Sequence, residues 1–410
     1  MTRAYARGAC PGLTAPMETG DGLLARLVPA GPIPLDAFIG LCAAARAHGN
    51  GIMEITSRGS VQLRGLTPLS AHLFAAVVDG LDIDISEGVP VIADPLQDDP
   101  AALIDANSVA ALLRHTIDAA GLSLALKVSV VVDGGGRLSL DALFADIRLR
   151  ALGTPEGPKF HLALAGDAGS ATPLGMIAQD EVIDAVLTLL TLIAAGGPEA
   201  RAADVLPTLA GSRSANATAP LRPRSDAIGR HALKNATCAL GLGLAFGHAQ
   251  AETLAELARM AKLRGADWVR PAPGRALLVG PLGEASATAA TRGAEKLGFI
   301  VETADPRRRI AACPGAPACA HGLIAARALA AEIVRHVPLA GDEIAIHVSG
   351  CAKGCAHQKP APLTVVGTAQ GCGIVREGSA QSTPSAYTNP ADLVSELDRI
   401  MGRTREATHA

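Results

Sequence analysis

A-C-P-G-A-P-A-C (Ala312–Cys319) and S-G-C-A-K-G-C (Ser349–Cys355) are the two stretches that decide the fold of this chain. They contain four of its eight cysteines, spaced C-x5-C and C-x3-C. Four thiolates at one place bind either zinc or an iron–sulfur cluster. Structural zinc usually uses tighter pairs, so C-x5-C with its two prolines matches it poorly. Four unrelated buried cysteines, or disulfides, are weaker alternatives.

The residues between the two stretches predict how the cysteines could meet. His321–His336 is rich in Ala and Leu, with apolar residues at helical spacing, and predicts an amphipathic helix that ends before Pro338. Glu343–Val348 alternates as a short strand does. Each cysteine pair therefore lies beside the end of an element, where four sulfurs can converge.

At these cysteines the sequence resembles the superfamily of sirohaem-dependent nitrite and sulfite reductases. Its members carry C-x5-C, a long gap and C-x3-C around one 4Fe–4S cluster. The resemblance implies that Cys313, Cys319, Cys351 and Cys355 are cluster ligands. It also implies that Cys355 faces the tetrapyrrole cavity.

Length and composition favour a multidomain chain with no nucleic-acid or membrane partner. At 410 residues it can form two or more cores, and with 2% aromatic residues these must consist mainly of Ala, Leu, Val and Ile. The net charge of −3 indicates neither partner, and no long apolar run predicts a membrane span. Met1–Cys10 has no apolar signal-peptide region, so we expect a cytoplasmic protein with reduced thiols.

An internal repeat predicts two similar halves. The first copy has a strand within Pro16–Leu27, a helix at Leu35–His48, and strands at Ile52–Ser57 and Ser60–Leu66. About 215 residues later the pattern recurs, with a strand at Leu240–Gly247, a helix at Gln250–Arg264 and a strand at Ala276–Val279. Gly211–Ser225, rich in Ser, Pro and Arg, reads as the linker. The fold class expected from this repeat and from the resemblance is α+β, a pseudo-twofold nitrite/sulfite reductase-like architecture. The expected units are ferredoxin-like half-domains at 1–72 and 206–285, and larger α+β domains at 73–205 and 286–410, the last of which carries the cluster.

The first half contains T-S-R-G-S-V-Q-L-R-G (Thr56–Gly65), which predicts a strand, a turn and a strand. Gln62 and Arg64 share one face with Ser60, and Arg58 lies in the turn. Composition alone favours an ordinary solvated hairpin. The superfamily, however, carries T-x-R-x-x-x-Q here, and its Arg and Gln bind the acidic side chains of the tetrapyrrole. The resemblance implies that Arg58, Gln62 and Arg64 bind substrate carboxylates.

Lys127 is the single charge in Leu124–Asp133, a predicted strand. It is either an ordinary edge lysine or, by the resemblance, a catalytic cation. The reductases carry a second lysine two residues on, where this chain has Ser129, and an arginine in the segment matching Glu87–Leu96, where this chain has none. Arg26 is an ambiguous match to another family arginine. A site with fewer cations suits a small anion poorly and suits neutral O2 better.

The remaining candidates carry weaker signals. Lys353 lies inside the C-x3-C turn and could meet a substrate carboxylate or tune the cluster. Three histidines flank the cysteine motifs, and two arginines in the linker could be further anchors: His321, His347, His357, Arg222 and Arg224. Cys10, in a repeat of the A-C-P-G tetrapeptide, reads as a turn cysteine with only a small chance of contacting iron or substrate.

Several stretches over nearly the whole chain resemble the precorrin-3B synthase family, the cobalamin-pathway branch of the superfamily. They are Ala9–Arg26, Thr56–Gly65, Asp98–Ala106, Val132–Asp141, Leu221–Gly229 and Leu240–Gly247. The resemblance implies an iron–sulfur monooxygenase that uses O2 to hydroxylate precorrin-3A with lactone formation. It implies a 4Fe–4S cluster and leaves room for a mononuclear non-haem iron.

Two other functions stay open. One is a sirohaem-dependent nitrite or sulfite reductase, the only case in which sirohaem is expected. The other is a non-catalytic protein that binds iron or tetrapyrroles. No G-x-G-x-x-G follows a predicted strand, and Gly134–Gly136 reads as a hairpin turn. Electrons must therefore come from an external reductase or ferredoxin.

Overall fold

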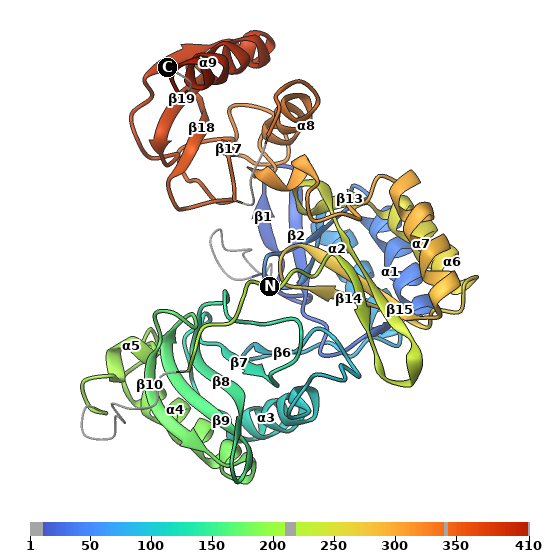
Figure 1. Cartoon of the computed structure of the whole chain (residues 1–410), viewed down its shortest axis with the longest axis vertical. Coiled ribbons are helices and arrows are strands. Elements are labelled where there is room, and N and C mark those ends of the chain that lie inside the picture. Colours follow the sequence, from blue (N-terminus) through green and yellow to red (C-terminus); the bar gives the residue numbers. More distant parts are fainter. Residues whose placement is uncertain (1–10, 210–218, 340–342, 409–410) are drawn as a thin grey trace.

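The computed structural model describes residues 11–209, 219–339 and 343–408, so Cys10 and most of the predicted linker lie outside the described residues. Within these ranges the strands form four sheets of five strands each. Two sheets occupy the middle of the molecule, the C-terminal sheet lies at one end, and the sheet of residues 91–177 lies at the other (Figure 1). None of the described helices is long and apolar enough to cross a membrane.

The first central sheet has the order β1-β2-β5-β4-β13. Its strands are Met17–Thr19, Gly22–Leu27, Val61–Leu66, Ile52–Ile55 and His248–Gln250. Helices α1 (Leu35–His48) and α2 (Pro68–Asp79) pack on one face, onto which the alternation of β5 directs Val61 and Leu63. Gln62 and Arg64 therefore lie on the opposite face, as the sequence predicts.

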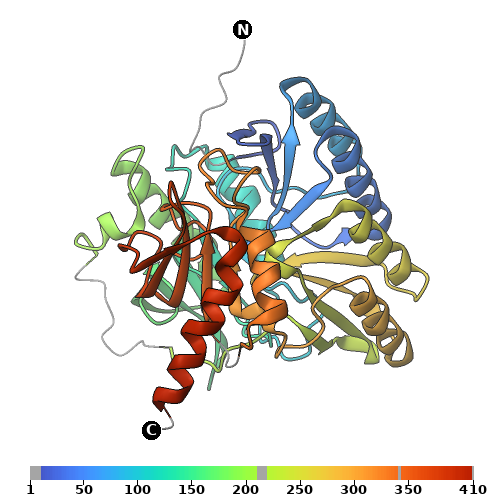
Figure 2. The same cartoon turned by 90° about the horizontal axis from the view of Figure 1, so that it is seen from above.

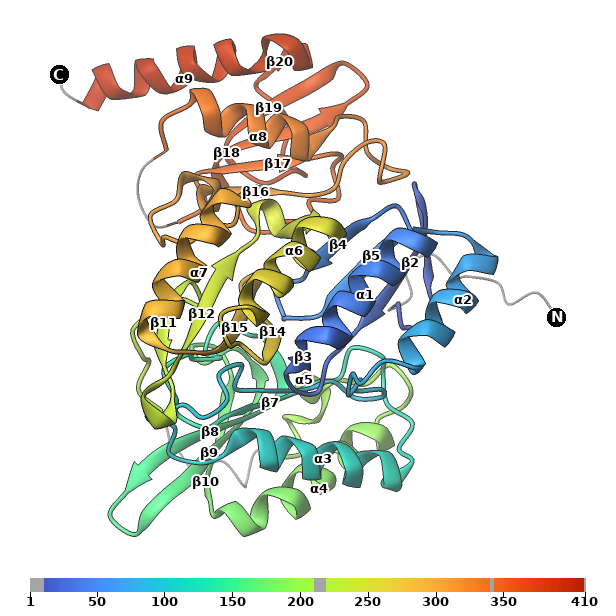
Figure 3. The same ribbon diagram turned by 90° about the vertical axis from the view of Figure 1, so that its right-hand side faces the viewer.

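The second central sheet has the order β11-β12-β15-β14-β3. Its strands are Gly229–Ala232, Cys238–Gly243, Ala276–Leu282, Trp268–Ala272 and Ile33–Pro34. Helices α6 (Ala251–Lys262) and α7 (Glu284–Lys296) cover it on the same side as α1 and α2 cover the first sheet, and Figure 3 shows these four helices side by side. Seen from above, they form the outer wall of the central pair (Figure 2).

The two central sheets exchange strands. Strand β13 from the second half pairs with β4, and β3 from the first half pairs with β14. Arg58 forms an isolated bridge with Pro273, its counterpart at the repeat spacing of 215 residues, which puts this pair on the pseudo-twofold axis. Buried side chains of both halves, from α1 and α6 among others, share one hydrophobic core. The pseudo-twofold expectation is therefore confirmed.

The two outer sheets repeat each other. In β6-β7-β8-β9-β10 and in β16-β17-β18-β19-β20 the first three strands are parallel and the others antiparallel. The strands of the first are Val91–Ala93, Val130–Asp133, Ala145–Thr154, Gly157–Gly166 and Thr172–Ile177. Those of the second are Ile310–Ala312, Ile346–Ser349, Ala361–Thr368, Gly371–Gly378 and Ala386–Thr388. The helices that pack with the first outer sheet are α3 (Ala106–Ala120), α4 (Val182–Ala195) and α5 (Ala202–Val205). Those that pack with the second are α8 (Ala326–His336) and α9 (Leu393–Thr408).

Local sequence explains where several helices begin and end. The Asp105 carboxylate accepts from the backbone N–H groups of Asn107 and Ser108 at the start of α3, and Gly121 ends this helix with φ 57°. Thr67 and Ser70 form a reciprocal capping box at the start of α2. These signals fix the ends of helices whose apolar faces then pack on the sheets.

Three sequence predictions need correction. The strand expected at Leu124–Asp133 begins only at Val130, because a turn precedes it. The helix expected from His321 begins at Ala326, because the preceding residues form the cysteine loop. Gly134–Gly136 is not a hairpin turn, since β7 and β8, which flank it, are parallel and require a crossover.

Candidate functional site

The four motif cysteines come together because of the parallel pairing of β16 and β17. Cys313 directly follows β16 and Cys351 closely follows β17, so both loops start at the same sheet edge. Burial raises the pKa of the Cys355 thiol, and the neighbouring thiols of Cys313, Cys351 and Cys319 raise it further. The backbone N–H of Gly350 donates to the Cys313 sulfur at 3.1 Å. The two cysteine loops therefore start at one sheet edge, and the thiols of Cys313, Cys319 and Cys351 lie near enough to Cys355 to affect its pKa.

The four motif thiols are a soft donor set. All four are free cysteines. In the part of the chain that is described, no three His, Cys, Asp or Glu side chains are grouped closely enough to hold one metal ion. A tetrahedral zinc needs its ligands in one tight shell, whereas each cysteine around a 4Fe–4S cluster binds a different iron. The donor set at this sheet edge is therefore all-thiol, and within the described ranges it does not form a single-ion site.

A row of polar side chains crosses the inner face of the first central sheet. Arg26 on β2 pairs in register with Gln62 on β5, Gln62 with Glu54 on β4, and Glu54 with His248 on β13. The Gln62 amide oxygen accepts from Arg26 at 2.6 and 2.9 Å, and its nitrogen donates to Glu54 at 3.2 Å. Arg327 of α8 reaches Glu54 at 2.8 Å. This row links the T-S-R-G-S-V-Q hairpin to the cysteine domain.

Arg58 connects the hairpin turn to the outer sheet of the first half. Its guanidinium donates to the Phe144 carbonyl at 2.8 Å and to the Ser129 hydroxyl at 3.2 Å. Burial lowers the pKa of Arg58, while the charge of Asp146 opposes that shift. Ser129 is only 5% exposed. Ser129, two residues after Lys127, thus contacts the arginine proposed from the sequence.

Arg64 is bound by the protein itself. It donates to both carboxylate oxygens of Asp21, at 3.2 and 2.9 Å, and to the carbonyl of Ala318 inside the C-x5-C loop. Its side chain is 6% exposed. As the structure has it, this guanidinium holds the cysteine loop, and its predicted contact with a substrate carboxylate would require it to leave these partners.

Comparisons with known proteins agree with this geometry. The ferredoxin-like half-domain of nitrite and sulfite reductases matches residues 15–71. A precorrin-3B synthase from Sinorhizobium sp is 41% identical over 403 residues, which is 96% of this chain and 88% of that protein. The chain belongs to the precorrin-3B synthase family. A solved structure, the Mycobacterium tuberculosis NirA protein, matches with a TM-score of 0.70 and 18% identity over 92% of this chain and 80% of that one, which shows the shared fold.

The two lysines proposed for this family member lie at exposed positions. Lys127 is exposed in the turn before β7, where its carbonyl accepts from Arg201 at 3.1 Å. Lys353 is exposed within the C-x3-C turn, and its charge lowers the pKa of the Cys355 thiol, against the effect of burial. Neither lysine has a protein partner among the described ion pairs, so both charges remain available to a ligand.

The linker arginines differ from each other. Arg222 binds two carboxylates, the fully buried Asp133 and, at 2.8 Å, Asp141. It therefore ties the chain between the halves to the first outer sheet. Arg224 is exposed. Of the two, only Arg224 has the freedom that the predicted substrate contact requires.

The histidines near the cysteines also differ. His347 on β17 is fully buried, and neither ring nitrogen has a hydrogen-bond partner among the described residues. Burial, with a smaller effect of His357, lowers the pKa of His347 to about 4. The His357 ring lies edge-on to it, with 5.7 Å between the ring centres. His321 is exposed.

Sequence reasoning missed four site residues: Glu54, His248, Arg275 and Arg327. Arg275 lies in the turn between β14 and β15 and donates to the Ala356 carbonyl, next to Cys355, at 3.3 Å. A signal existed, since Gly274-Arg275 falls in the hairpin equivalent to Arg58-Gly59. Glu54 and His248 gave no such signal, because only the exchanged strand brings them together.

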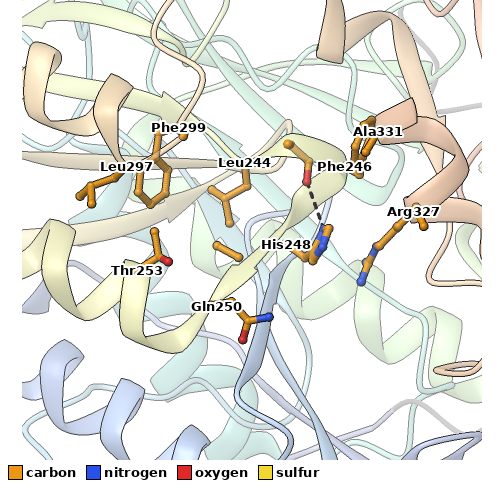
Figure 4. Close-up of a pocket in the computed structure, with 13 residues that line it drawn as sticks. Leu244, Phe246, His248, Gln250, Thr253, Leu297, Phe299, Arg327 and Ala331 are labelled. Carbon is orange, nitrogen blue, oxygen red and sulfur yellow. Dashed lines mark hydrogen bonds between the residues drawn. The ribbon is translucent and has the colours of Figure 1, made fainter. Parts of the chain in front are cut away.

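A cavity of about 440 Å³ lies at one end of the polar row. Figure 4 shows His248 and Arg327 at its polar end and Leu244, Leu297 and Phe299 at its apolar end. The Nδ1 atom of His248 lies 3.1 Å from the Ala245 carbonyl, and burial lowers its pKa to about 4. None of the four motif cysteines lines this cavity, so it is separate from the thiol site.

Proposed function

We propose that this protein is the precorrin-3B synthase of aerobic cobalamin biosynthesis. The reaction is the hydroxylation of precorrin-3A by O2, with lactone formation. One oxygen atom enters the substrate and the other leaves as water, which requires electrons and protons from an external donor. The observation that carries the proposal is the identity of 41% with a precorrin-3B synthase over 96% of the chain.

The proposed cofactor is a 4Fe–4S cluster on Cys313, Cys319, Cys351 and Cys355. When bound, it supplies single-electron transfer between the donor and the substrate cavity. The support is the all-thiol donor set at the shared edge of β16 and β17. The chain's own part is to hold the four thiolates, and the charge of Lys353 favours the charged form of Cys355.

A mononuclear non-haem iron finds less support. His347 has two free ring nitrogens and His357 lies beside it. Such iron sites usually need two histidines and a carboxylate, and no group of three possible ligands is gathered within the described ranges. The described residues therefore offer no complete ligand set for a second iron.

Arg58 and Gln62 are the proposed anchors for the carboxylates of precorrin-3A. A guanidinium has five N–H donors. Arg58 uses one N–H of Nη1 on the Phe144 carbonyl and one N–H of Nη2 on the Ser129 hydroxyl. Donors therefore remain for a carboxylate. Gln62 keeps Arg26 in place through its amide oxygen, which adds a third group to the same face. Lys127, exposed at the turn before β7, is proposed to lie near the reacting edge of the substrate.

The cation set favours O2 over an anion as the reactant. Ser129 stands where the reductases have a second lysine, and the segment Glu87–Leu96 has no arginine. Reduction of nitrite or sulfite needs preorganised charge at the anion, and each lost donor costs ~3–4 kcal/mol in comparable sites. Oxygen carries no charge and makes no such demand.

An absorbance spectrum with iron and sulfide analysis tests this proposal against the sirohaem reductase. We expect a broad cluster shoulder without the intense bands of sirohaem. Turnover assays should then show O2-dependent conversion of precorrin-3A and negligible reduction of nitrite or sulfite. Robust reduction of either anion would restore the reductase, and no turnover with a reductant present would favour a binding protein.

The electron donor is proposed to be a separate reductase or ferredoxin, since no dinucleotide-binding fingerprint is present in the sequence. We further propose that the protein works in the cytoplasm, where thiols stay reduced and available to iron.

A further inference from the structure

Each cysteine loop is held by an arginine from a different half of the molecule. Arg64, on β5 of the first central sheet, donates to the Ala318 carbonyl, one residue before Cys319. Arg275, in the turn between β14 and β15 of the second central sheet, donates to the Ala356 carbonyl, one residue after Cys355. The C-x5-C and C-x3-C loops thus each have one carbonyl bound by an arginine, and the two arginines come from different central sheets.

Asp21 fixes the Arg64 guanidinium independently of its contact with the cysteine loop. Its Nε and Nη2 atoms donate to the two oxygens of Asp21 at 3.2 and 2.9 Å. Asp21 also accepts from Thr19 at 2.8 Å and from Asn50 at 2.9 Å. Such a two-point contact fixes the plane of the guanidinium as well as its position, so little freedom is left at the Ala318 carbonyl.

Gly20 forms a seat for the next peptide of the same loop. A Cβ atom on Gly20 would lie 2.2 Å from the Ala320 nitrogen and 2.5 Å from the Cys319 carbonyl carbon. The peptide that joins Cys319 to Ala320 therefore lies directly on Gly20, and no larger residue fits. The E-T-G-D-G turn of the N-terminal hairpin thus contacts a cysteine loop 300 residues away in the sequence.

Arg275 is held by packing and burial. Its side chain lies against Gly247, where a Cβ atom would be 2.6 Å from the Arg275 Cδ atom. Burial lowers its pKa, as does nearby Arg327, while Glu54 opposes that shift. Its guanidinium therefore reaches Ala356 from a packed position.

We propose that Arg64, seated with Gly20 and Asp21, and Arg275 are positioning residues that set where Cys319 and Cys355 bind the cluster. This inference rests on the cluster proposed above. A short loop transmits the position of a fixed carbonyl to the neighbouring Cα atom, and hence to the sulfur. Partners of this kind, outside the direct ligands, typically change metal affinity ~10- to 100-fold.

The test uses charge-conserving variants of the full-length holoprotein. Arg64→Lys and Arg275→Lys keep the positive charge but lose the planar fork, and Gly20→Ala fills the seat. Arg46→Lys, an exposed arginine paired with Glu252, and Gly31→Ala, where a Cβ meets nothing within 4 Å, are the matched controls. The measurements are iron and sulfide content, the rate of iron loss to a chelator, the EPR spectrum of the reduced cluster, and its midpoint potential.

We expect the controls to match the wild type. Arg64→Lys and Arg275→Lys should fold, lose iron to the chelator ~10- to 100-fold faster, and show a shifted EPR spectrum and midpoint potential. Gly20→Ala should lose the iron at the Cys319 corner. Because lysine keeps the positive charge of arginine, a shifted midpoint potential reports a change in geometry and not the loss of a charge.

The failures are distinguishable. If the wild-type protein contains neither iron nor sulfide, the cluster itself is wrong. If it contains both, but the two lysine variants keep the wild-type EPR spectrum, potential and iron-loss rate, only the positioning role is wrong. Should Gly20→Ala not fold, the lysine variants alone decide.

Discussion

The two outer domains place different chemistry on the same loops. In the first, β6 is followed by Asp94 and β7 ends at Asp133; in the second, β16 is followed by Cys313 and β17 ends at Ser349. The backbone N–H of Gly134 donates to the Asp94 carboxylate at 3.1 Å, and that of Gly350 donates to the Cys313 sulfur at the same distance. One duplicated sheet edge therefore holds carboxylates in one half and thiols in the other.

The partners of these groups differ in a way that explains their roles. Arg222 from the linker neutralises Asp133 and Asp141, so the first edge is closed by the chain itself. At the second edge the thiols of Cys313, Cys319 and Cys351 lie near that of Cys355. Soft thiolates select iron–sulfur clusters. The comparison teaches that the same sheet edge carries acidic side chains with an arginine partner in one half and thiols in the other, where the cluster is proposed.

The two central sheets differ in the same manner. By their ladders, Gln62 of the first corresponds to Leu278 of the second, since both lie at the middle of their β4–β5 and β14–β15 pairings. Leu278 belongs to an apolar cluster that includes Leu96 and Leu138 of the first outer domain. The first sheet instead keeps its polar row. The second sheet therefore packs an apolar side chain against a neighbouring domain, where the first sheet carries the polar Gln62.

The largest effect should follow from breaking the thiol edge. Replacing any one of Cys313, Cys319, Cys351 or Cys355 by Ser should abolish the intact cluster and much of the stability, because cluster binding is coupled to folding. Iron and sulfide analysis with thermal unfolding measures both. Cys238→Ala and Cys372→Ala, at buried cysteines away from the loops, are the controls. Loss of iron in Cys238→Ala with retention in Cys355→Ser would overturn the ligand assignment.

The carboxylate edge should be sensitive to its counter-charge. Arg222→Met leaves the fully buried Asp133 without its arginine, and breaking a buried pair typically costs ~3–5 kcal/mol. The midpoint of urea unfolding should fall accordingly. Arg230→Met removes an exposed pair with Glu284 and should cost less than ~1 kcal/mol. Equal losses in the two variants would contradict the structural role of Arg222.

Much of this architecture could be predicted from the sequence, because its signals are local. The helix at Leu35–His48 has the predicted bounds, and the apolar alternation of Thr56–Gly65 correctly separates Gln62 and Arg64 from the core face. The spacing of the four cysteines likewise predicted that their loops meet. Each of these depends on residues close together in the chain.

What the sequence could not reveal depends on contacts between distant segments. The turn that ends the expected strand before Val130 moves Lys127 to an exposed position. Arg64 donates to Asp21 and to the Ala318 carbonyl only because the N-terminal hairpin and the cysteine loop lie next to each other in the fold. His248 enters the polar row only through strand exchange. None of these has a local pattern, so the motif alone suggested a free substrate anchor at Arg64.

The pH dependence of stability offers a finer test of the carboxylate edge. Burial, together with the charge of Asp133, raises the pKa of Asp94 to about 8 from an ordinary 3.8. The folded state therefore holds a proton that the unfolded state releases, and this contribution to stability is lost as pH rises from about 4 through about 8. Asp94→Asn keeps an acceptor for Gly134 and removes the titration. The urea midpoint of Asp94→Asn, relative to that of the wild type, should therefore rise from pH 5 to pH 8.5. A difference between the two midpoints that stays constant over this range would refute the raised pKa.

The smallest effect tests whether the first half alone binds substrate. At the residue pair on the pseudo-twofold axis the first half has Arg58 and the second has Pro273, so only the first half has a guanidinium at this position. Loss of a charged hydrogen bond in Arg58→Ala should weaken precorrin-3A binding by ~2 kcal/mol, or about 30-fold. The cluster spectrum should not change, because Arg58 contacts Phe144 and Ser129 and no cysteine loop. Arg46→Ala, at an exposed ion pair, is the control. Titration of each variant with precorrin-3A measures the difference, and an unaltered affinity in Arg58→Ala would mean that Thr56–Gly65 does not line the substrate cavity.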